Sequence, residues 1–263
     1  MYPFFDIYGA LIYTFWIALT ISFFVFLWIL RRLETRFWYN FQFFSHNILW
    51  FFLSVFFFSR VFYVIWKWND MKFITEPFQF FVMSEYNFSL FWAIFWFLLV
   101  LYILCKIEKT PMKRYIDGVV LAFLATVSIW YIGSLLWGQV YGRETTFWIE
   151  ILYTNPFTLV PYQVPVFPLP IVYALLSFII FSALYMLSLF VHIRWYIWYL
   201  GMILFSTMIL VFDFFSGKQD ILSINTWFTF PQLFALMLIV WSGYMFYKVF
   251  HWDTSGQDTQ LHG

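Results

Sequence analysis

The chain has 263 residues, of which 64% are hydrophobic, 28% are aromatic and only 10% are charged. Soluble domains carry about 25% charged residues, so this composition excludes a water-soluble globule and indicates a protein embedded in a bilayer. The net charge of +1 provides no field that would attract nucleic acid, and we expect no such partner.

Residues that commonly hold metals or cofactors are sparse. The chain has one cysteine, Cys105, which excludes an internal disulfide, and its four histidines are scattered, at His46, His192, His251 and His262. No HExxH pattern, glycine-rich phosphate loop or GxSxG motif occurs. We therefore expect neither a metal nor a cofactor.

Apolar stretches long enough to cross a bilayer recur along the chain. A helix needs about 20 mostly apolar residues to span the hydrocarbon, and the segments are apolar all round rather than alternating as in a barrel. The sequence predicts an all-α, polytopic integral membrane protein with seven transmembrane helices. The first stretch lacks the features of a cleavable signal peptide and is expected to remain as an anchor. The predicted spans cover residues 9–30, 47–66, 88–105, 119–137, 171–193, 195–215 and 232–250.

The distribution of basic residues predicts the orientation. With the N-terminus outside and the C-terminus inside, the two most basic short loops both face the cytoplasm, as the positive-inside rule requires. We expect residues 1–252 to form a single transmembrane domain and residues 253–263 to form a disordered cytoplasmic tail. The inner basic residues are then Arg31, Arg32, Arg36, Lys106, Lys109, Lys113, Arg114, Arg194 and Lys248.

A proline-rich segment, residues 138–170, follows the fourth predicted span on the outer side. Proline at this density prevents a regular helix. Irregular backbone is tolerated at membrane depth only where it is packed in protein or lines a wet cavity. The segment is therefore our candidate for a lid or a re-entrant wall. Its prolines are Pro156, Pro161, Pro165, Pro168 and Pro170.

Two charged residues lie within predicted spans, each toward the outer end. An intramembrane arginine is costly without a partner. Arg60 either extends to the outer headgroups, pairs with an acid or grips a lipid phosphate. Asp213 lies at a similar depth and is its natural partner. A structural ion pair and a functional one remain open as alternatives.

Arg143 follows a glycine-rich stretch at the end of the fourth predicted span. Gly138 and Gly142 permit positive φ or a close backbone approach, and an arginine there can bind a phosphodiester through two hydrogen bonds. The alternative is a solvated arginine paired with Glu144. Tyr8, at the start of the first predicted span, is either an interfacial anchor or a hydrogen-bond donor to the same site.

These residues, in this order, resemble the prolipoprotein diacylglyceryl transferase family over nearly the whole chain. The family's arginine-and-tyrosine stretch is similar to residues 58–63, and its glycine-rich signature is similar in spacing to residues 130–143. The outer Val-Pro-Val-x-Pro segment falls on residues 164–168. Further matching positions are Ile7, Tyr8, Gly9, Asp117, Gly133, Gly138, Gly142, Arg143, Asp213 and Gln232.

The resemblance implies a multi-pass enzyme of the bacterial cytoplasmic (inner) membrane. Such an enzyme moves diacylglyceryl from phosphatidylglycerol onto the lipobox cysteine thiol of a preprolipoprotein and releases glycerol phosphate. The phospholipid and the preprolipoprotein signal peptide would then be the partners. Arg143, Arg60 and Tyr8 would serve catalysis, and Arg60, Arg143, Gly142 and Gly138 would bind the lipid phosphate.

The chain also departs from the family pattern at several polar positions. The family's histidine segment falls on residues 90–93, which contain no histidine, and Ile209 stands where helix six has an arginine. A catalytically silent member that binds lipid or a membrane partner is therefore the alternative function. A transporter is disfavoured because we find no internal repeat. The signature departures are Tyr131, Ser134, Trp137 and Gln139.

Overall fold

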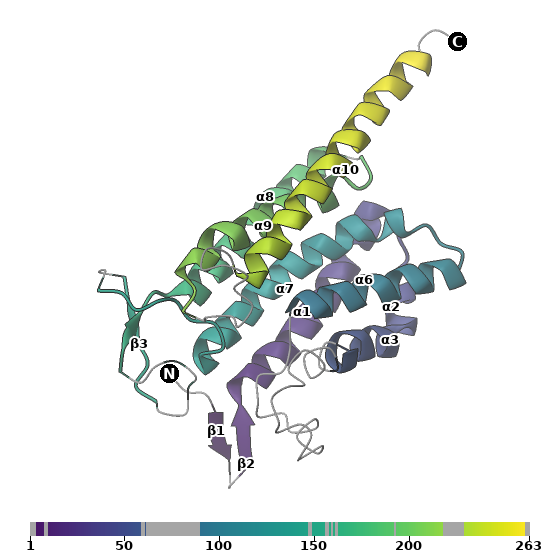
Figure 1. Ribbon diagram of the computed structural model, residues 1–263. Coiled ribbons are helices and arrows are strands. Elements are labelled where there is room, and N and C mark those ends of the chain that lie inside the picture. The colour runs from purple at the N-terminus through teal and green to yellow at the C-terminus, as the bar shows by residue number, and fades with distance from the viewer. Residues whose placement is uncertain are drawn as a thin grey trace. The chain divides into compact units, whose positions relative to one another are not determined.

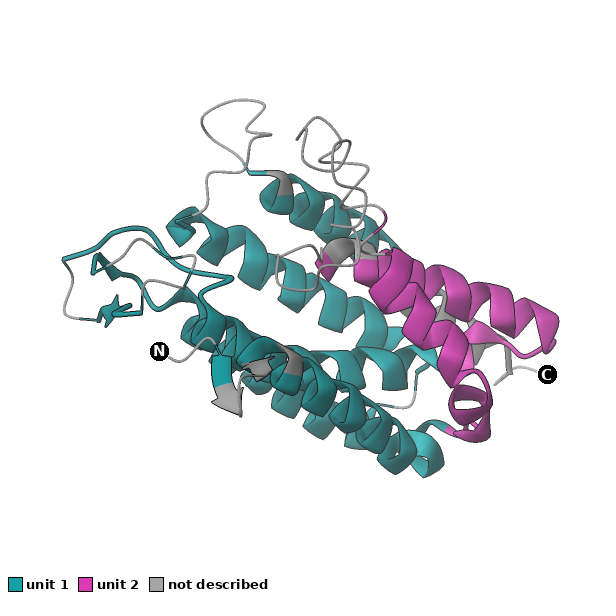
Figure 2. Ribbon diagram, turned by 90° about the horizontal axis from the view of Figure 1, so that it is seen from below, with its two compact units in different colours: residues 1–37, 115–263 teal, residues 38–114 magenta. Residues whose placement is uncertain are grey.

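The computed structural model consists largely of helices (Figure 1). It describes residues 4–7, 10–58, 61, 90–146, 149–155, 158, 160, 163–191, 193–217 and 229–260. The chain forms two compact units, Met1–Phe37 with Tyr115–Gly263, and Trp38–Arg114 (Figure 2). Each unit is described separately below.

In the described part of the first unit, five α-helices form the bundle. Helix α7 packs against α1, α8 and α9, and α9 also packs against α8 and α10. In Figure 1, α1 and α7 run side by side, and α10 lies against α9. The bounds are Thr14–Phe37 for α1, Ile116–Trp137 for α7, Leu169–Phe190 for α8, Tyr196–Phe212 for α9 and Phe230–Gln260 for α10.

Small residues let α7 occupy the middle of this unit. A Cβ added at Gly133 would lie 2.3 Å from Cβ of Ala18 on α1, and one added at Gly201 of α9 would lie 2.9 Å from Cγ2 of Val120 on α7. Within a bilayer, helices are held by van der Waals packing, which such close approaches favour. Most of α7 is accordingly buried.

Within the described residues, four helices are long and apolar enough to cross a membrane. Shorter apolar helices cover Ile48–Phe58 and Ala93–Ile107. The helical class and the presence of several candidate spans are thus confirmed, while the count of seven stays a prediction. The four candidates are Ile116–Trp137, Leu169–Phe190, Tyr196–Phe215 and Pro231–Val249.

A short hairpin precedes α1. Strands β1 (Phe4–Ile7) and β2 (Ala10–Tyr13) pair antiparallel, with Phe4 opposite Tyr13 and Ile7 opposite Ala10. The helix therefore begins at Thr14, later than the start of the first predicted span. Branched and aromatic residues in β2 suit a strand as well as an apolar helix, so composition alone does not locate this boundary.

In the second unit, the first apolar stretch forms several short helices. Helix α2 (Gln42–His46), helix α3 (Ile48–Leu53) and a π-helical turn, η1 (Ser54–Phe58), replace one continuous helix. Asn47 separates α2 from α3, and its side-chain amide donates to Phe43 O at 3.0 Å and to Glu108 Oε1 at 2.6 Å. Asparagine side chains compete with the helix for backbone partners, which explains the interruption.

Helix α6 (Leu90–Ile107) packs against η1, and the one-turn helix η3 (Met112–Arg114) ends this unit. The ring of Phe58 stacks on Trp96, and Phe51 contacts Phe97. Cys105 on α6 is buried and unbridged, as expected of a small apolar residue. Arg60 lies outside the described residues, as does Tyr8 in the first unit.

The last helix extends beyond its candidate span. Because α10 continues to Gln260, it overlaps the segment at residues 253–263 for which the sequence predicts a disordered tail. That tail and the single domain at residues 1–252 stay predictions.

Candidate functional site

The candidate site begins where α7 ends. Gly138 has a φ of 81°, and the N–H groups of Gly138 and Gln139 both donate to Ser134 O, at 2.9 and 3.0 Å. A left-handed residue closes a helix in this way, and glycine adopts that conformation without steric penalty. The chain therefore turns sharply out of α7 into the proline-rich segment.

Four short segments then form a small sheet, which we call the loop sheet. Strand β3 (Ile151–Leu152) pairs with β4 (Pro165–Val166), and β4 also bridges to Glu144. Residues 141–145 lie between β4 and residues 215–217, where Gly142 bridges to Ser216. The described part of the proline-rich segment thus contains short strands and no helix before α8.

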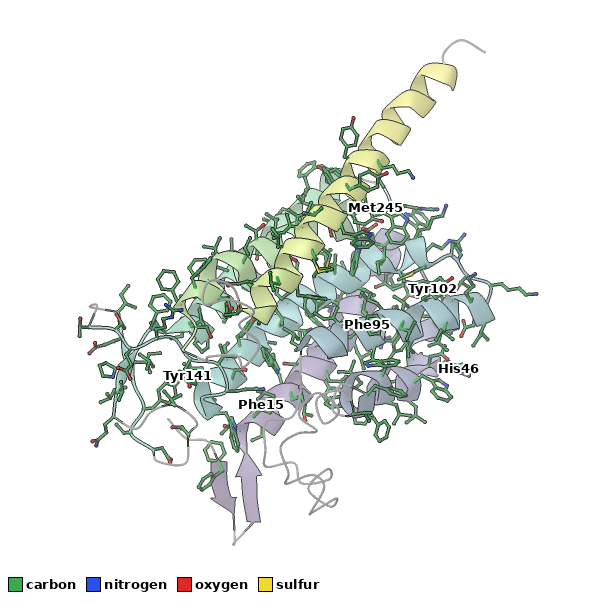
Figure 3. All side chains as sticks on the ribbon, viewed as in Figure 1. Phe15, His46, Phe95, Tyr102, Tyr141 and Met245 are labelled. Atoms are coloured by element: carbon green, nitrogen blue, oxygen red, sulfur yellow. The ribbon has the colours of Figure 1, made fainter. Side chains whose placement is uncertain are left out.

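Gly142 occupies a crowded position of the loop sheet. A Cβ added there would lie 2.4 Å from Phe167 O, and its N–H donates to that oxygen at 3.1 Å. Gly217 faces it, because a Cβ on Gly217 would lie 2.5 Å from Gly142 O. Glycine is needed here for close backbone approach. The neighbouring Tyr141 is labelled in Figure 3.

The loop sheet holds the backbone of Arg143 from both sides. Its N–H donates to Phe215 O at 2.7 Å, and its carbonyl accepts from Phe167 N at 3.0 Å. The side chain is exposed, and Nε donates to Ser216 O at 3.3 Å. Among the described residues this backbone oxygen, rather than Glu144, is the partner of the guanidinium. The guanidinium is therefore carried by a backbone that is hydrogen-bonded on both sides.

Asp213 lies on the same turn that binds Arg143. It begins the one-turn helix η4 (Asp213–Phe215) that follows α9, and its carbonyl accepts from Ser216 N at 3.0 Å. Its carboxylate accepts a short hydrogen bond from the hydroxyl of Thr229. The structure therefore brings Arg143 and Asp213 together through Ser216. The expected partner Arg60 lies outside the described residues, so that pairing stays a prediction.

Thr229 links this turn to the start of α10. Thr229 N donates to Gln232 Oε1 at 2.9 Å, and Gln232 N donates to Thr229 Oγ1 at 3.4 Å. This reciprocal arrangement is a capping box, with threonine at the N-cap and glutamine three residues later. The motif Thr-Phe-Pro-Gln is visible in the sequence, with proline near the helix start, but our sequence analysis missed it.

Two tyrosines lie near the same carboxylate. Tyr131 on α7 and Tyr173 on α8 are each 4% exposed, and their ring centroids lie 4.8 Å apart. Asp213 acts electrostatically on both phenols. An uncharged aromatic pair therefore lies beside this carboxylate.

A buried tyrosine fastens the loop sheet to α7. The hydroxyl of Tyr153 donates to Leu135 O at 3.1 Å, and the ring packs with Val160 and Val166. Burial raises the pKa of Tyr153 to about 12, because the phenolate would lose its hydration. This small core shows that the described part of the proline-rich segment is packed. Its service as a lid or a re-entrant wall stays a prediction.

Asp117 is buried at the opposite end of α7. Its two carboxylate oxygens accept from the N–H groups of Trp195 and Trp198, each at 2.8 Å. Trp195 is the N-cap residue of α9, with a φ of 72°, and has no side-chain cap of its own. Asp117 lies in the first turn of α7, where an acidic residue also favours that helix, and its carboxylate caps the start of α9. This role is structural and lies away from Arg143.

The described residues contain no group of three or more His, Cys, Asp or Glu side chains that could hold a metal ion.

A family model described as prolipoprotein diacylglyceryl transferase matches residues 3–248. No curated protein matches the chain. The matched range contains the loop sheet, most of α10 and the helices α1, α2, α3, α6, α7, α8 and α9.

Proposed function

Because the chain belongs to the prolipoprotein diacylglyceryl transferase family, we propose that it transfers diacylglyceryl from phosphatidylglycerol to the lipobox cysteine of a preprolipoprotein. The thiol sulfur forms a bond to the terminal carbon of the diacylglyceryl group. The bond between that carbon and the phosphate oxygen breaks, glycerol phosphate leaves, and the thiol proton passes to a base. Neither a metal nor a cofactor is required.

The observation that carries this proposal is the position of Arg143. Its backbone is hydrogen-bonded on both sides, and its exposed guanidinium is steadied through Nε by Ser216 O. Fixed cations stabilise charge that develops on a leaving phosphate, and arginine suits phosphate because it presents several donors in one plane. In this proposal Arg143 contacts the phosphate, Gly138 and Gly142 shape the backbone around it, and Arg60 and Tyr8 supply further contacts.

The membrane arrangement belongs to the proposal as well. The family resides in the cytoplasmic membrane. We place this chain in the bacterial inner membrane as one seven-span domain, with the N-terminus outside and the C-terminus inside. The loop sheet then faces outward, where exported preprolipoproteins present their lipobox. The distribution of basic residues supports this orientation.

Complementation in bacteria depleted of their own transferase tests the proposal. Expression of the chain should restore diacylglyceryl modification of a reporter lipoprotein, detected by its mobility and mass. Arg143→Ala should abolish the modification, and Arg143→Lys should retain only a small part of it, because lysine keeps the charge but loses the planar donors. Absence of modification at normal expression and membrane insertion would overturn the proposal.

A silent family member that binds lipid or a membrane partner is the second candidate. It is favoured by uncharged residues at signature positions, since Tyr131 is buried against Tyr173 and Gln139 is 7% exposed. Such a protein would bind phosphatidylglycerol in nanodiscs and leave the reporter unmodified. Measuring lipid binding alongside complementation therefore separates the two candidates.

A further inference from the structure

Gln232, in the first turn of α10, holds a buried amide donor that the described part of the chain does not use. Its side chain is 1% exposed, and among the described residues Nε2 has no hydrogen-bond partner. Buried polar groups in native proteins nearly always have one, so this donor requires a partner such as a water molecule or a ligand. We propose that Gln232 Nε2 donates to an ester carbonyl oxygen of the bound glycerophospholipid. This inference rests on the proposed function, which makes such a lipid the substrate.

The capping box determines which atom of the Gln232 carboxamide has no hydrogen-bond partner among the described residues. Thr229 N donates to Gln232 Oε1 at 2.9 Å, and only the oxygen of a carboxamide can accept that hydrogen bond. The nitrogen therefore points away from the N-cap. The hydrogen bond between Gln232 N and Thr229 Oγ1 restrains the same turn from the other side. The donor is thus held in place before any ligand arrives.

Charge indicates that the acceptor is neutral. The hydroxyl of Thr229 also donates to the Asp213 carboxylate, so that carboxylate lies one side chain away from the carboxamide. A phosphate at Gln232 would be repelled by this neighbouring negative charge, whereas a carbonyl oxygen would not. The phosphate of the lipid belongs instead with Arg143, which is joined to Asp213 through Ser216. One lipid would then be bound at two chemically different points.

The depth of Gln232 agrees with an ester carbonyl. It is the second residue of the candidate span Pro231–Val249. A span begins where the hydrocarbon meets the headgroup region, and the ester groups of glycerophospholipids lie at that boundary. A buried donor at this depth therefore meets carbonyl oxygens of lipid rather than bulk water.

Lipid binding by the full-length protein, without peptide, tests the inference. The probes are dioleoyl phosphatidylglycerol and its dialkyl ether analogue, which lacks both carbonyls. We expect the native chain to bind the ester about fivefold to tenfold more tightly, as one hydrogen bond of ordinary strength provides. In Gln232→Glu the ratio should fall to about one. With the assay run well above neutral pH, the ionised glutamate retains the capping interaction with Thr229 but has no hydrogen to donate, and its added charge affects both lipids alike.

Ser242→Ala is the matched control. Ser242 lies on the same helix, about 15 Å further along, and its hydroxyl is buried without a partner among the described residues. Its removal should leave the ester-to-ether ratio unchanged. Gln232→Met replaces Gln232→Glu if the added charge prevents folding, with the same expected ratio.

The outcomes separate this inference from the proposed function. The inference is overturned if the native chain binds the ester and ether lipids equally. It is also overturned if the ester-to-ether ratio is unchanged in Gln232→Glu, or if neither lipid binds. A ratio unchanged in Gln232→Glu would mean that the ester preference arises from another group. If complementation fails while the ester preference is present and disappears in Gln232→Glu, the inference stands and the transferase activity does not. Transfer without any ester preference overturns the inference alone.

Discussion

Replacing Gly142 by alanine adds one methyl group at a crowded position of the loop sheet. The new Cβ would lie 2.4 Å from Phe167 O and 2.6 Å from Phe167 Cβ, and one of these atoms belongs to the backbone and cannot rotate away. The two segments must therefore separate. Separation breaks the hydrogen bonds from Gly142 N to Phe167 O and from Phe167 N to Arg143 O.

The magnitude follows from those two bonds. A backbone hydrogen bond contributes about 0.5–1.5 kcal/mol net, so the loss of two lowers the free energy of unfolding by about 1–3 kcal/mol. Overpacking of a filled interior has a similar cost, about 1–3 kcal/mol. Arg143 loses the restraint on its carbonyl as well, so lipoprotein modification in the complementation assay should fall with the stability.

Gly243→Ala is the matched control, because it adds the same methyl group to α10 where nothing lies within 4 Å of the new Cβ. Alanine is favoured over glycine within a helix by about 0.8–1 kcal/mol, so this variant should be more stable than the native chain. The assay is unfolding of purified protein in mixed micelles titrated with a denaturing detergent. A Gly142→Ala variant as stable as Gly243→Ala would refute the close approach at Phe167.

Two further predictions concern buried groups on either side of α7. Asp117→Ala removes the acceptor of the N–H groups of Trp195 and Trp198. It should lower the free energy of unfolding by about 1–3 kcal/mol in the same titration. A loss below 0.5 kcal/mol, roughly the smallest expected for a cap, would contradict the capping role. Burial raises the pKa of Tyr153 to about 12, above its unfolded value, so its contribution to stability is complete below pH 10 and is lost as the pH rises through 12. Between pH 10 and pH 12 the free energy of unfolding of the native chain should fall by roughly 2 kcal/mol more than that of Tyr153→Phe. Parallel pH profiles of stability for the two proteins would contradict this prediction.

Composition determined the class of this protein. With 10% charged residues and apolar stretches of membrane-spanning length, the chain has too little polar surface to fold in water, whatever its tertiary arrangement. The positions of α7, α8, α9 and α10 follow from the lengths of these stretches, because an apolar segment in lipid must satisfy its backbone internally. The glycine spacing of the family was recognisable for a related reason, since the left-handed φ of Gly138 and the close approach at Gly142 both favour glycine.

Local sequence was less informative where a segment is apolar but does not form one long helix. Asn47 lies at the start of the second predicted span, where it reads as a boundary residue, yet it separates α2 from α3. Its amide reaches Glu108, 61 positions along the chain. A contact between residues so distant in sequence leaves no local pattern, so only the folded unit reveals it.

The roles of the polar residues were decided by the tertiary structure. Asp117 lies in the first turn of α7, but its carboxylate binds the start of α9, 81 residues away from it at Trp198. The carboxylate of Asp213 accepts from Thr229, a contact that no local pattern predicted, whereas its expected pairing with Arg60 lies outside the described residues and stays a prediction. A side chain on one helix can reach backbone groups on any neighbouring helix, and the choice of neighbour depends on packing. Hydropathy therefore predicts where helices lie along the chain, whereas only their three-dimensional packing shows which polar group each buried side chain binds.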